Sequence, residues 1–350
     1  MSNNFGTIVV CDFEYEVADG ELPSVLCMVA YVLDEYLRHV HTFRLWRGEF
    51  GSTPPFDIGP NALYVAYSAW AELTCFMVLG WKFPEHIFDL HTAYLATSNV
   101  LGPYDPDEKR AKERRRLSDA CRAYGIEGWE QIDKEAISKD VGEGRWQKYG
   151  RDAVLKYCDE DVRAAAELLR RQLRGGPGLP PADPERVLFW SSYSAKVTAQ
   201  VQARGMPIDT SLWDLVQENK RAVIGELLRQ LDPSYGSENP IFSSDGEWSY
   251  TRFVRWLASI GVAAWPRLES GQLDLRGDAF QTMAHVPGIE GLRALRKSLR
   301  VIAGAKLPIG RDGRNRARLF PFGTLTGRNA TPRESIQRTR RFAVVHSFPA

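Results

Sequence analysis

Two carboxylates stand two residues apart in the run VVCDFEYEV, namely Asp12 and Glu14. Alternate side chains of a β-strand project from the same face, so both carboxylates would point the same way. The apolar neighbours Val9, Val10 and Cys11 predict an interior strand, and buried carboxylates need a compensating charge. A hard divalent cation is the partner that oxygen ligands suit best. Surface strands also carry this pattern, so the pair alone does not fix a metal site.

Two later segments add groups of the same chemistry. Tyr157 and Asp161 are four residues apart in KYCDEDVRAAAELL, which places them on one face of a predicted helix. Asp159 and Glu160 would point elsewhere and be solvated. Glu72 opens another predicted helix directly after an apolar strand. Each acid, taken alone, also fits the preference of helix N-termini for negative charge.

The elements that must position these groups form an α/β arrangement. Three β-rich runs with short connections predict an antiparallel meander, and a buried strand, a helix and a short strand follow them. Two more helices complete this part. We therefore expect a mixed sheet flanked by helices. The segments are 7–17, 24–35 and 40–50 for the meander, 61–69, 69–81 and 86–90 for the next three elements, and 117–124 and 151–172 for the helices.

A Gly/Pro-rich segment interrupts the chain after this part. Seven of the ten residues from Gly175 to Pro184 are Gly or Pro, so neither helix nor sheet is expected there, and we predict a linker. The chain beyond this linker is expected to be mainly helical. The predicted helices cover 183–205, 211–231, 249–261 and 288–305.

Composition excludes several classes of protein. The 350 residues are 44% hydrophobic and 25% charged, which is typical of a globular protein with room for about two domains. The five cysteines show no C-x-x-C spacing, which argues against a disulfide scaffold or a thiolate zinc site and favours a reducing compartment. The N-terminus does not resemble a signal peptide, and no run is long enough to span a bilayer, so a cytoplasmic protein without membrane contact is expected.

The net charge of +1 hides an asymmetry at the C-terminal end. From Lys306 to Ala350 there are one Lys and nine Arg against Asp312 and Glu334, which is a local charge of +8. Arginines clustered without compensating carboxylates favour contact with phosphates. A solvated basic tail is the alternative.

The order of the acidic motifs resembles the DEDD-type 3′–5′ proofreading exonuclease domain, in its tyrosine-bearing branch. Asp12 and Glu14 match its first motif, Glu72 stands where the second motif has Asp, and Tyr157 and Asp161 match the last motif. The resemblance implies a ribonuclease H-like fold and two Mg²⁺ or Mn²⁺ ions. Asp12, Glu14 and Asp161 would hold one ion, Asp12 and Glu72 the other, and Tyr157 would orient the attacking water.

The second motif departs from the pattern of that family. The family usually reads H/E-N-x-x-F/Y-D, whereas this chain has Tyr67, Ser68, Ala71 and Glu72 at the corresponding positions. The spacing is kept, and a glutamate reaches one methylene further than an aspartate.

The resemblance continues beyond the linker, to family A DNA polymerases. VTAQVQARGMPID is similar to the segment that opens their polymerase region, and ARLFPFGTLTGR is similar to the T-x-T-G-R stretch that precedes the first palm motif. The resemblance implies that Thr326, Arg328 and the preceding Arg314 and Arg316 lie against DNA. It implies an exonuclease domain at 1–174, a linker at 175–184, a thumb-like helical region at 185–305 and an incomplete, Arg-rich palm start at 306–350.

The two palm aspartates of that family have no counterpart here. Beyond Arg328 the chain has 22 residues with no Asp and a single acid, Glu334. Polymerase activity is therefore not expected from this chain alone, because two-metal phosphoryl transfer needs carboxylates to hold the ions. The sequence predicts a 3′–5′ exonuclease of a truncated family A polymerase, acting in DNA replication on single-stranded 3′ ends and primer–template duplex. The alternative is a decayed or split polymerase fragment that only binds DNA or works with a separate C-terminal chain.

Overall fold

The chain forms two compact units in the computed structural model, which describes residues 5–98, 116–127, 134–303, 307–316, 319, 321 and 328–329. Unit 1 comprises Met1–Pro207 and Pro308–Pro332, and unit 2 comprises Ile208–Leu307 and Arg333–Ala350. The segment Ile208–Leu307 of unit 2 is thus inserted into the sequence of unit 1. The residues of the C-terminal tail after Asn329 lie outside the described residues.

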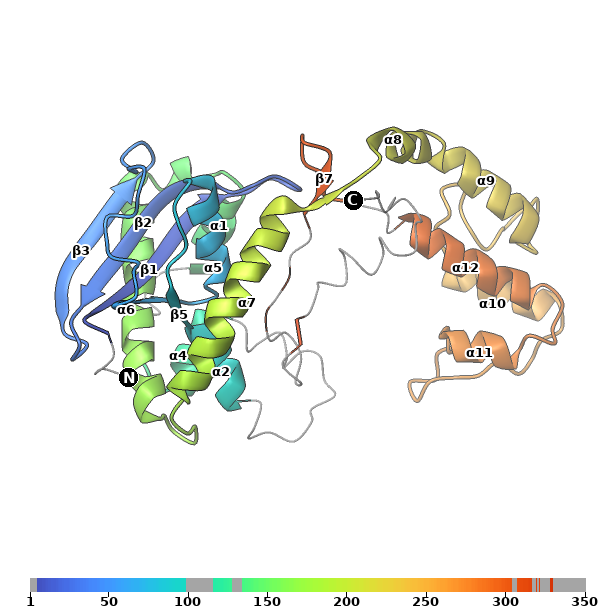
Figure 1. Cartoon of the computed structure of the whole chain (residues 1–350). Coiled ribbons are helices and arrows are strands. Elements are labelled where there is room, and N and C mark those ends of the chain that lie inside the picture. Colours follow the sequence, from blue (N-terminus) through green and yellow to red (C-terminus); the bar gives the residue numbers. More distant parts are fainter. Residues whose placement is uncertain are drawn as a thin grey trace. The chain divides into compact units, whose positions relative to one another are not determined.

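A five-stranded mixed sheet forms the centre of unit 1, in the order β3-β2-β1-β4-β5 (Figure 1). The first three strands are antiparallel neighbours, as the sequence predicts, and β4 and β5 run parallel to β1. The sequence therefore predicts the mixed α/β class of this unit correctly. The strands are β1 (Thr7–Glu16), β2 (Ser24–Leu33), β3 (His39–Trp46), β4 (Ala62–Ala66) and β5 (His86–Asp89).

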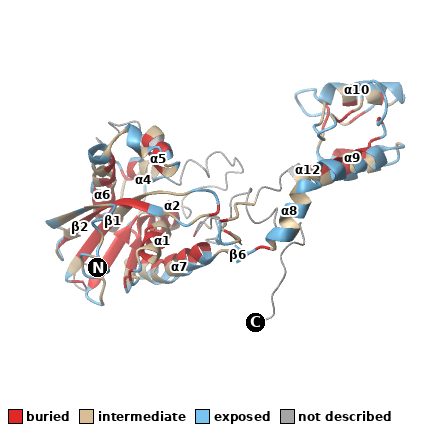
Figure 2. Ribbon diagram, turned by 90° about the horizontal axis from the view of Figure 1, so that it is seen from above, coloured by how far each residue is buried: buried red, intermediate tan, exposed pale blue. Residues whose placement is uncertain are grey.

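Helices cover both faces of this sheet, so that buried residues line it on both sides (Figure 2). One face packs on α1 and α7 through residues such as Val9, Cys11 and Phe76. The other packs on α6 and its neighbours through residues such as Val10 and Leu168. The helices are α1 (Trp70–Val78), α2 (Leu90–Ser98), α4 (Leu117–Ala123), α5 (Lys134–Gly142), α6 (Arg151–Arg174) and α7 (Pro184–Arg204). The sequence did not predict α2 and α5.

The Gly/Pro-rich segment lies inside unit 1. Residues 175–183 form neither helix nor strand apart from an isolated bridge between Gly176 and Leu179, as their composition predicts. The helix after it, α7, begins with Pro184 behind the capping side chain of Asp183 and buries Ala195 and Ala199 against α1. The compact units therefore divide at Pro207, whereas the predicted second domain begins at 185.

Unit 2 is helical, as the sequence predicts, around a core that includes Phe253, Phe280 and Leu292. The single helix expected over 211–231 is wrong, because the chain is divided at Asn219, whose side-chain amide donates a 2.8 Å hydrogen bond to the Leu215 carbonyl. The helices are α8 (Thr210–Glu218), α9 (Lys220–Leu231), α10 (Tyr250–Ser259), α11 (Gly277–Thr282) and α12 (Ile289–Ala303). Among the described helices of the chain, none is both long and apolar enough to cross a membrane.

After unit 2 the chain returns to unit 1 through a short ribbon. Strand β6 (Met206–Pro207) pairs antiparallel with β7 (Arg314–Asn315). Gly20 accommodates the returning segment because it has no side chain: a Cβ there would lie 2.5 Å from the backbone N of Gly310. The segment 308–316, which belongs to the predicted palm start, therefore packs against the rest of unit 1.

Candidate functional site

Strand β1 carries Asp12 and Glu14 on the face that α6 covers. Val10 precedes them on this face, in the core on the α6 side. Glu14 stands opposite Cys27 of β2, and the pairing of the two strands shifts directly after Glu14. Both carboxylates are half-buried. Such irregularities re-aim side chains and are frequent beside active sites.

Helix α6 brings Tyr157 and Asp161 to the same place. Tyr157 is buried and hydrogen-bonds to the side chain of Ser138 in α5. Burial raises the pKa of the Tyr157 phenol, and the charges of Glu14, Asp161 and Asp12 raise it further. These influences require proximity, so Tyr157 lies among the acidic residues that the sequence singles out.

Glu72 approaches from the other side of the sheet, in the first turn of α1. Its side chain is only 4% exposed, and its Oε2 has no hydrogen-bond partner within the described chain. Burial raises its pKa well above the ordinary value, and the charge of Asp12 is the next cause. A buried carboxylate oxygen without a hydrogen-bond partner costs free energy, and a bound cation would offset that cost.

The carboxylates of this site repel one another. Burial is the main cause that raises the pKa of Glu14, followed by the charges of Asp12 and Asp161, with that of Glu72 a smaller contribution. A divalent cation would relieve this repulsion. Because the donors are mainly carboxylate oxygens and Glu72 offers an unpartnered one, the residues fit Mg²⁺ or Mn²⁺.

Cys158 is a neighbour of this site that sequence reasoning missed. Its Sγ lies 3.4 Å from Oδ2 of Asp12, to which the thiol donates, and 3.4 Å from the Asp12 carbonyl. In the part of the chain that the structure describes, ligand atoms of Asp12, Glu14 and Cys158 all lie within 4.8 Å of one another. Neither Glu72 nor Asp161 belongs to this close group.

The signal that could have found Cys158 is its helical spacing. It stands four residues after Val154 and four before Val162, both fully buried on the side of α6 that faces the sheet. Burial raises the pKa of the Cys158 thiol well above its usual range, with further contributions from Cys27 and Asp12. The group is therefore a thiol that donates to Asp12. All five cysteines of the chain are buried free thiols.

The turn before Glu72 has an unusual backbone. Ser68 adopts φ +64°, a left-handed conformation in which Asn is strained less than most residues. Its N–H donates a 2.9 Å hydrogen bond to Oδ1 of Asp89, at the end of β5. This hydrogen bond holds the turn before Glu72 against the end of β5.

Asp159 is not solvated as predicted. Its carboxylate accepts hydrogen bonds from Tyr31 of β2 at 3.1 Å and from Arg44 of β3 at 2.6 Å. Asp159 therefore ties α6 to the meander, and its neighbour Glu160 is half-buried.

The residues predicted to contact DNA differ in exposure and in hydrogen bonding. Arg316 is 10% exposed, and its guanidinium donates to the carbonyls of Ala203 and Gly20 and to Asp312. Arg314 donates to the Arg204 carbonyl at 3.1 Å. Arg316 thus holds the returning segment in place within unit 1. Arg328 is exposed, and Thr326 lies outside the described residues.

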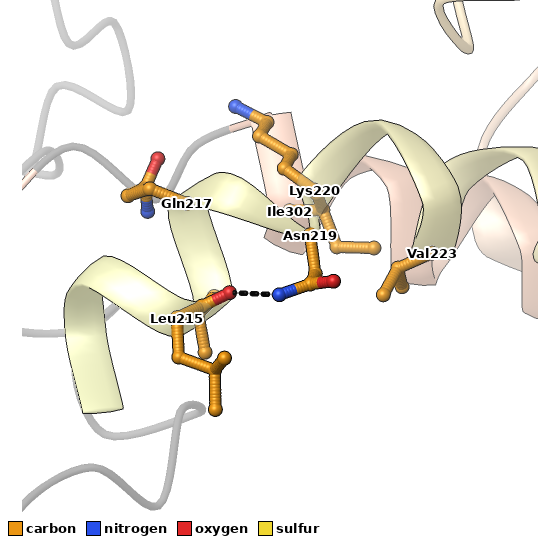
Figure 3. A pocket seen from close by; sticks show the side chains of 7 residues that line it. Leu215, Gln217, Asn219, Lys220, Val223 and Ile302 are labelled. Atoms are coloured by element: carbon orange, nitrogen blue, oxygen red, sulfur yellow. Dashed lines mark hydrogen bonds between the residues drawn. The ribbon is translucent and has the colours of Figure 1, made fainter. Parts of the chain in front are cut away.

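A cavity of about 410 Å³ lies in unit 2, between α8, α9 and α12 (Figure 3). Leu215, Val223 and Ile302 give it an apolar lining, and the Asn219–Leu215 hydrogen bond crosses the junction of α8 and α9 beside it. None of the predicted site residues lines it. This cavity is therefore separate from the candidate site.

Comparison with solved structures relates the fold of this chain to that of a DNA polymerase domain. One similar structure is the POL domain of Pol1 from M. smegmatis in complex with DNA primer-template and dNTP, a family A DNA polymerase. The TM-score is 0.54 at 13% sequence identity, and the match covers 94% of this chain and 51% of that chain. This chain thus spans about half the length of that polymerase chain. No protein-family description and no curated protein matches the sequence.

Proposed function

We propose that this chain is a divalent-metal-dependent 3′–5′ exonuclease that acts on DNA, within a family A DNA polymerase architecture. The observation that carries the proposal is geometric: ligand oxygens of Asp12 and Glu14 lie within 4.8 Å of one another, and Glu72 of α1 has a buried oxygen without a hydrogen-bond partner among the described residues. Besides burial, the charges of Asp12, Asp161 and Glu72 raise the pKa of Glu14, although these residues are far apart in the sequence. The polymerase fold of the Pol1 structure and its bound DNA support the choice of substrate.

In this proposal the acidic residues bind the metal ions and Tyr157 orients the attacking water. Asp12, Glu14 and Asp161 would hold one ion, and Asp12 and Glu72 would hold the other. When bound, such ions lower the pKa of water and neutralise charge on the departing 3′ oxygen. The hydroxyl of Tyr157 would form a hydrogen bond with the attacking water and so align this water with the terminal phosphorus. The thiol of Cys158 keeps the Asp12 carboxylate in position.

Binding of DNA would rest on phosphate contacts. Arg328 is exposed, and the Arg-rich tail from Lys306 onward carries the local charge of +8. The proposal extends to Arg314 and Thr326 as further contacts and to unit 2 as a thumb-like clamp. Affinity for DNA should then fall steeply with salt and depend little on sequence.

The decisive experiment is cleavage of a 3′-labelled single strand with Mg²⁺ or Mn²⁺. Wild-type protein should release the terminal nucleotide, and Asp12→Ala should be inactive. Asp152→Ala is the matched control, because Asp152 is an exposed acid in the first turn of α6. Equal rates for wild type and Asp12→Ala would overturn the proposal.

A second candidate function is a DNA-binding module without catalysis. One observation favours it: Glu72, the atypical residue of the second motif, does not join the close group of Asp12, Glu14 and Cys158. Titration with Mn²⁺ separates the two functions, since the nuclease should bind two ions. One ion or none, together with tight DNA binding, would favour the module.

A further inference from the structure

A soft ligand stands inside a site otherwise built for hard cations. The Sγ of Cys158 and carboxylate oxygens of Asp12 and Glu14 lie within 4.8 Å of one another, and Sγ is 3.4 Å from Oδ2 of Asp12. Mg²⁺ does not take sulfur ligands, whereas Zn²⁺ and Cd²⁺ prefer thiolates and accept carboxylates alongside them. The same three groups can therefore bind a different class of ion.

A second thiol lies beside the first. Cys27 of β2 stands opposite Glu14 in the strand register and is a hydrogen-bond partner of Cys158. Both side chains are fully buried. Sulfur from Cys158 and oxygen from the two carboxylates are donor types that Zn²⁺ accepts, whereas Cys27 lies outside this close group and contacts it only through Cys158.

The buried oxygen of Glu72, outside this group of three, is a separate sign that a cation belongs beside Asp12. Its Oε2 has no hydrogen-bond partner within the described residues, and its carboxylate lies close enough to Asp12 for the two charges to interact. A buried acceptor without a partner is costly unless an ion compensates it.

We propose that Asp12, Glu14 and Cys158 form a binding site for one soft divalent cation, such as Zn²⁺, that excludes the catalytic ions. Formation of the sulfur–metal bond breaks the S–H bond of Cys158, and the proton leaves to solvent. The bound ion occupies the Asp12 and Glu14 carboxylates, so Mg²⁺ or Mn²⁺ can no longer bind to them. Binding of the soft cation follows from the geometry of the three ligands. Inhibition of cleavage by this ion rests on the proposed nuclease function.

Cadmium is the probe, because a thiolate–cadmium bond absorbs in the ultraviolet. The full chain, free of other divalent ions, should take up one equivalent of Cd²⁺ with this band and with release of one proton. Cys158→Ser keeps a hydrogen-bond donor for Asp12 but lacks the soft ligand. Cys158→Ser should lose the ultraviolet band. Its affinity for Cd²⁺ should fall more than roughly tenfold, which is the loss that removing an outer-shell partner typically causes.

The matched control is Cys121→Ser, because Cys121 is equally buried but lies in a separate cluster on α4. Its Cd²⁺ band should equal that of wild type. A band that survives in Cys158→Ser, or that disappears equally in Cys121→Ser, would overturn the site. Cys158→Ala repeats the test if the serine variant does not fold, and electron paramagnetic resonance should show that Mn²⁺ still binds to either variant.

Nuclease assays then test the inhibition. Equimolar Cd²⁺ should suppress Mn²⁺-supported cleavage by wild type, while cleavage by Cys158→Ser, whatever its own rate, should resist Cd²⁺. Suppression of both proteins alike would overturn the inhibitory role of the thiolate. Absence of cleavage with every cation would overturn the proposed nuclease, whereas the Cd²⁺ titration would still decide the soft-cation site.

Discussion

The backbone N–H of Ser68 donates a 2.9 Å hydrogen bond to the carboxylate of Asp89. The same carboxylate accepts from the N–H of His91 at 3.0 Å and from the hydroxyl of Thr92 at 3.2 Å. Asp89 thereby ties the end of β5 to the turn that leads into Glu72. The position of the second motif thus depends on a buried acid that is not itself one of the proposed ligands.

Asp89 should make stability depend on pH. Burial raises its pKa from 3.8 to about 6, although its hydrogen bonds act in the opposite direction. The folded state therefore holds this proton more tightly than the unfolded state. The corresponding stability is fully present below about pH 4 and is lost as pH rises to about 6.

Replacing Asp89 with Asn should remove that dependence. Relative to Asp89→Asn, wild type should lose about 2 kcal/mol of unfolding free energy between pH 4 and 7, measured by urea denaturation. Asp34→Asn is the control, since hydrogen bonds from Arg38 lower the pKa of Asp34 and give the opposite sign. Parallel curves for wild type and Asp89→Asn would contradict the expectation.

Removing the charge of Glu72 should have opposite effects without and with metal. Glu72→Gln should raise the melting temperature of the metal-free protein at neutral pH, because a buried carboxylate without a partner is lost. With Mn²⁺ at about a hundredfold excess over the dissociation constant, wild type should gain about 3 kcal/mol and the variant less. Thermal unfolding with and without Mn²⁺ measures both effects. Glu85→Gln, at an exposed position, should change neither, and an unaltered Mn²⁺ response in Glu72→Gln would remove Glu72 from the site.

The phenol of Tyr157 should affect turnover more than binding. Tyr157→Phe keeps the ring in the core but removes the hydroxyl proposed to orient the water. Single-turnover cleavage should slow about 100-fold, a typical effect for a group that positions a proton or water. Mn²⁺ stoichiometry and KM should stay close to wild type. Tyr193→Phe, on the exposed face of α7, is the control, and a loss confined to KM would assign Tyr157 to DNA binding instead.

Gly20 should control the docking of the segment 308–316. Gly20→Ala combines φ +78° with a Cβ only 2.5 Å from the Ile309 and Gly310 backbone. Displacing the segment should cost more than about 2 kcal/mol and speed amide exchange at 309–316. Gly48→Ala shares a positive φ of +89° but meets open space, so it should cost only about 1 kcal/mol and leave that exchange unchanged. Equal exchange in both variants would contradict the packing role.

Local periodicity made much of unit 1 predictable. Alternation along β1 places Asp12 and Glu14 on one face, and the four-residue spacing of Tyr157 and Asp161 places them one helical turn apart. Both inferences need only the geometry of the element itself. The antiparallel meander followed from short connections between β-rich runs.

The features that the sequence did not reveal depend on tertiary contacts. Cys158 reads as an ordinary apolar position until α6 is laid against β1, where its thiol meets Asp12. Asp159 looks solvated until β2 and β3 supply Tyr31 and Arg44. Arg316 belongs to a basic segment whose charge predicts contact with phosphates. In the folded chain, however, its guanidinium donates hydrogen bonds to the carbonyls of Gly20 and Ala203.

The β6–β7 ribbon has a consequence for the order of folding. Met206 pairs with Asn315, so the segment Ile208–Leu307, which carries the helices of unit 2, is synthesised between the two strands of one ribbon. Unit 1 can complete this ribbon only after the intervening chain has left the ribosome. Early collapse of unit 2 would shorten the loop that this pairing must close, and so lower its entropic cost. The helical insertion would then act as an intramolecular aid to the maturation of the domain that encloses it.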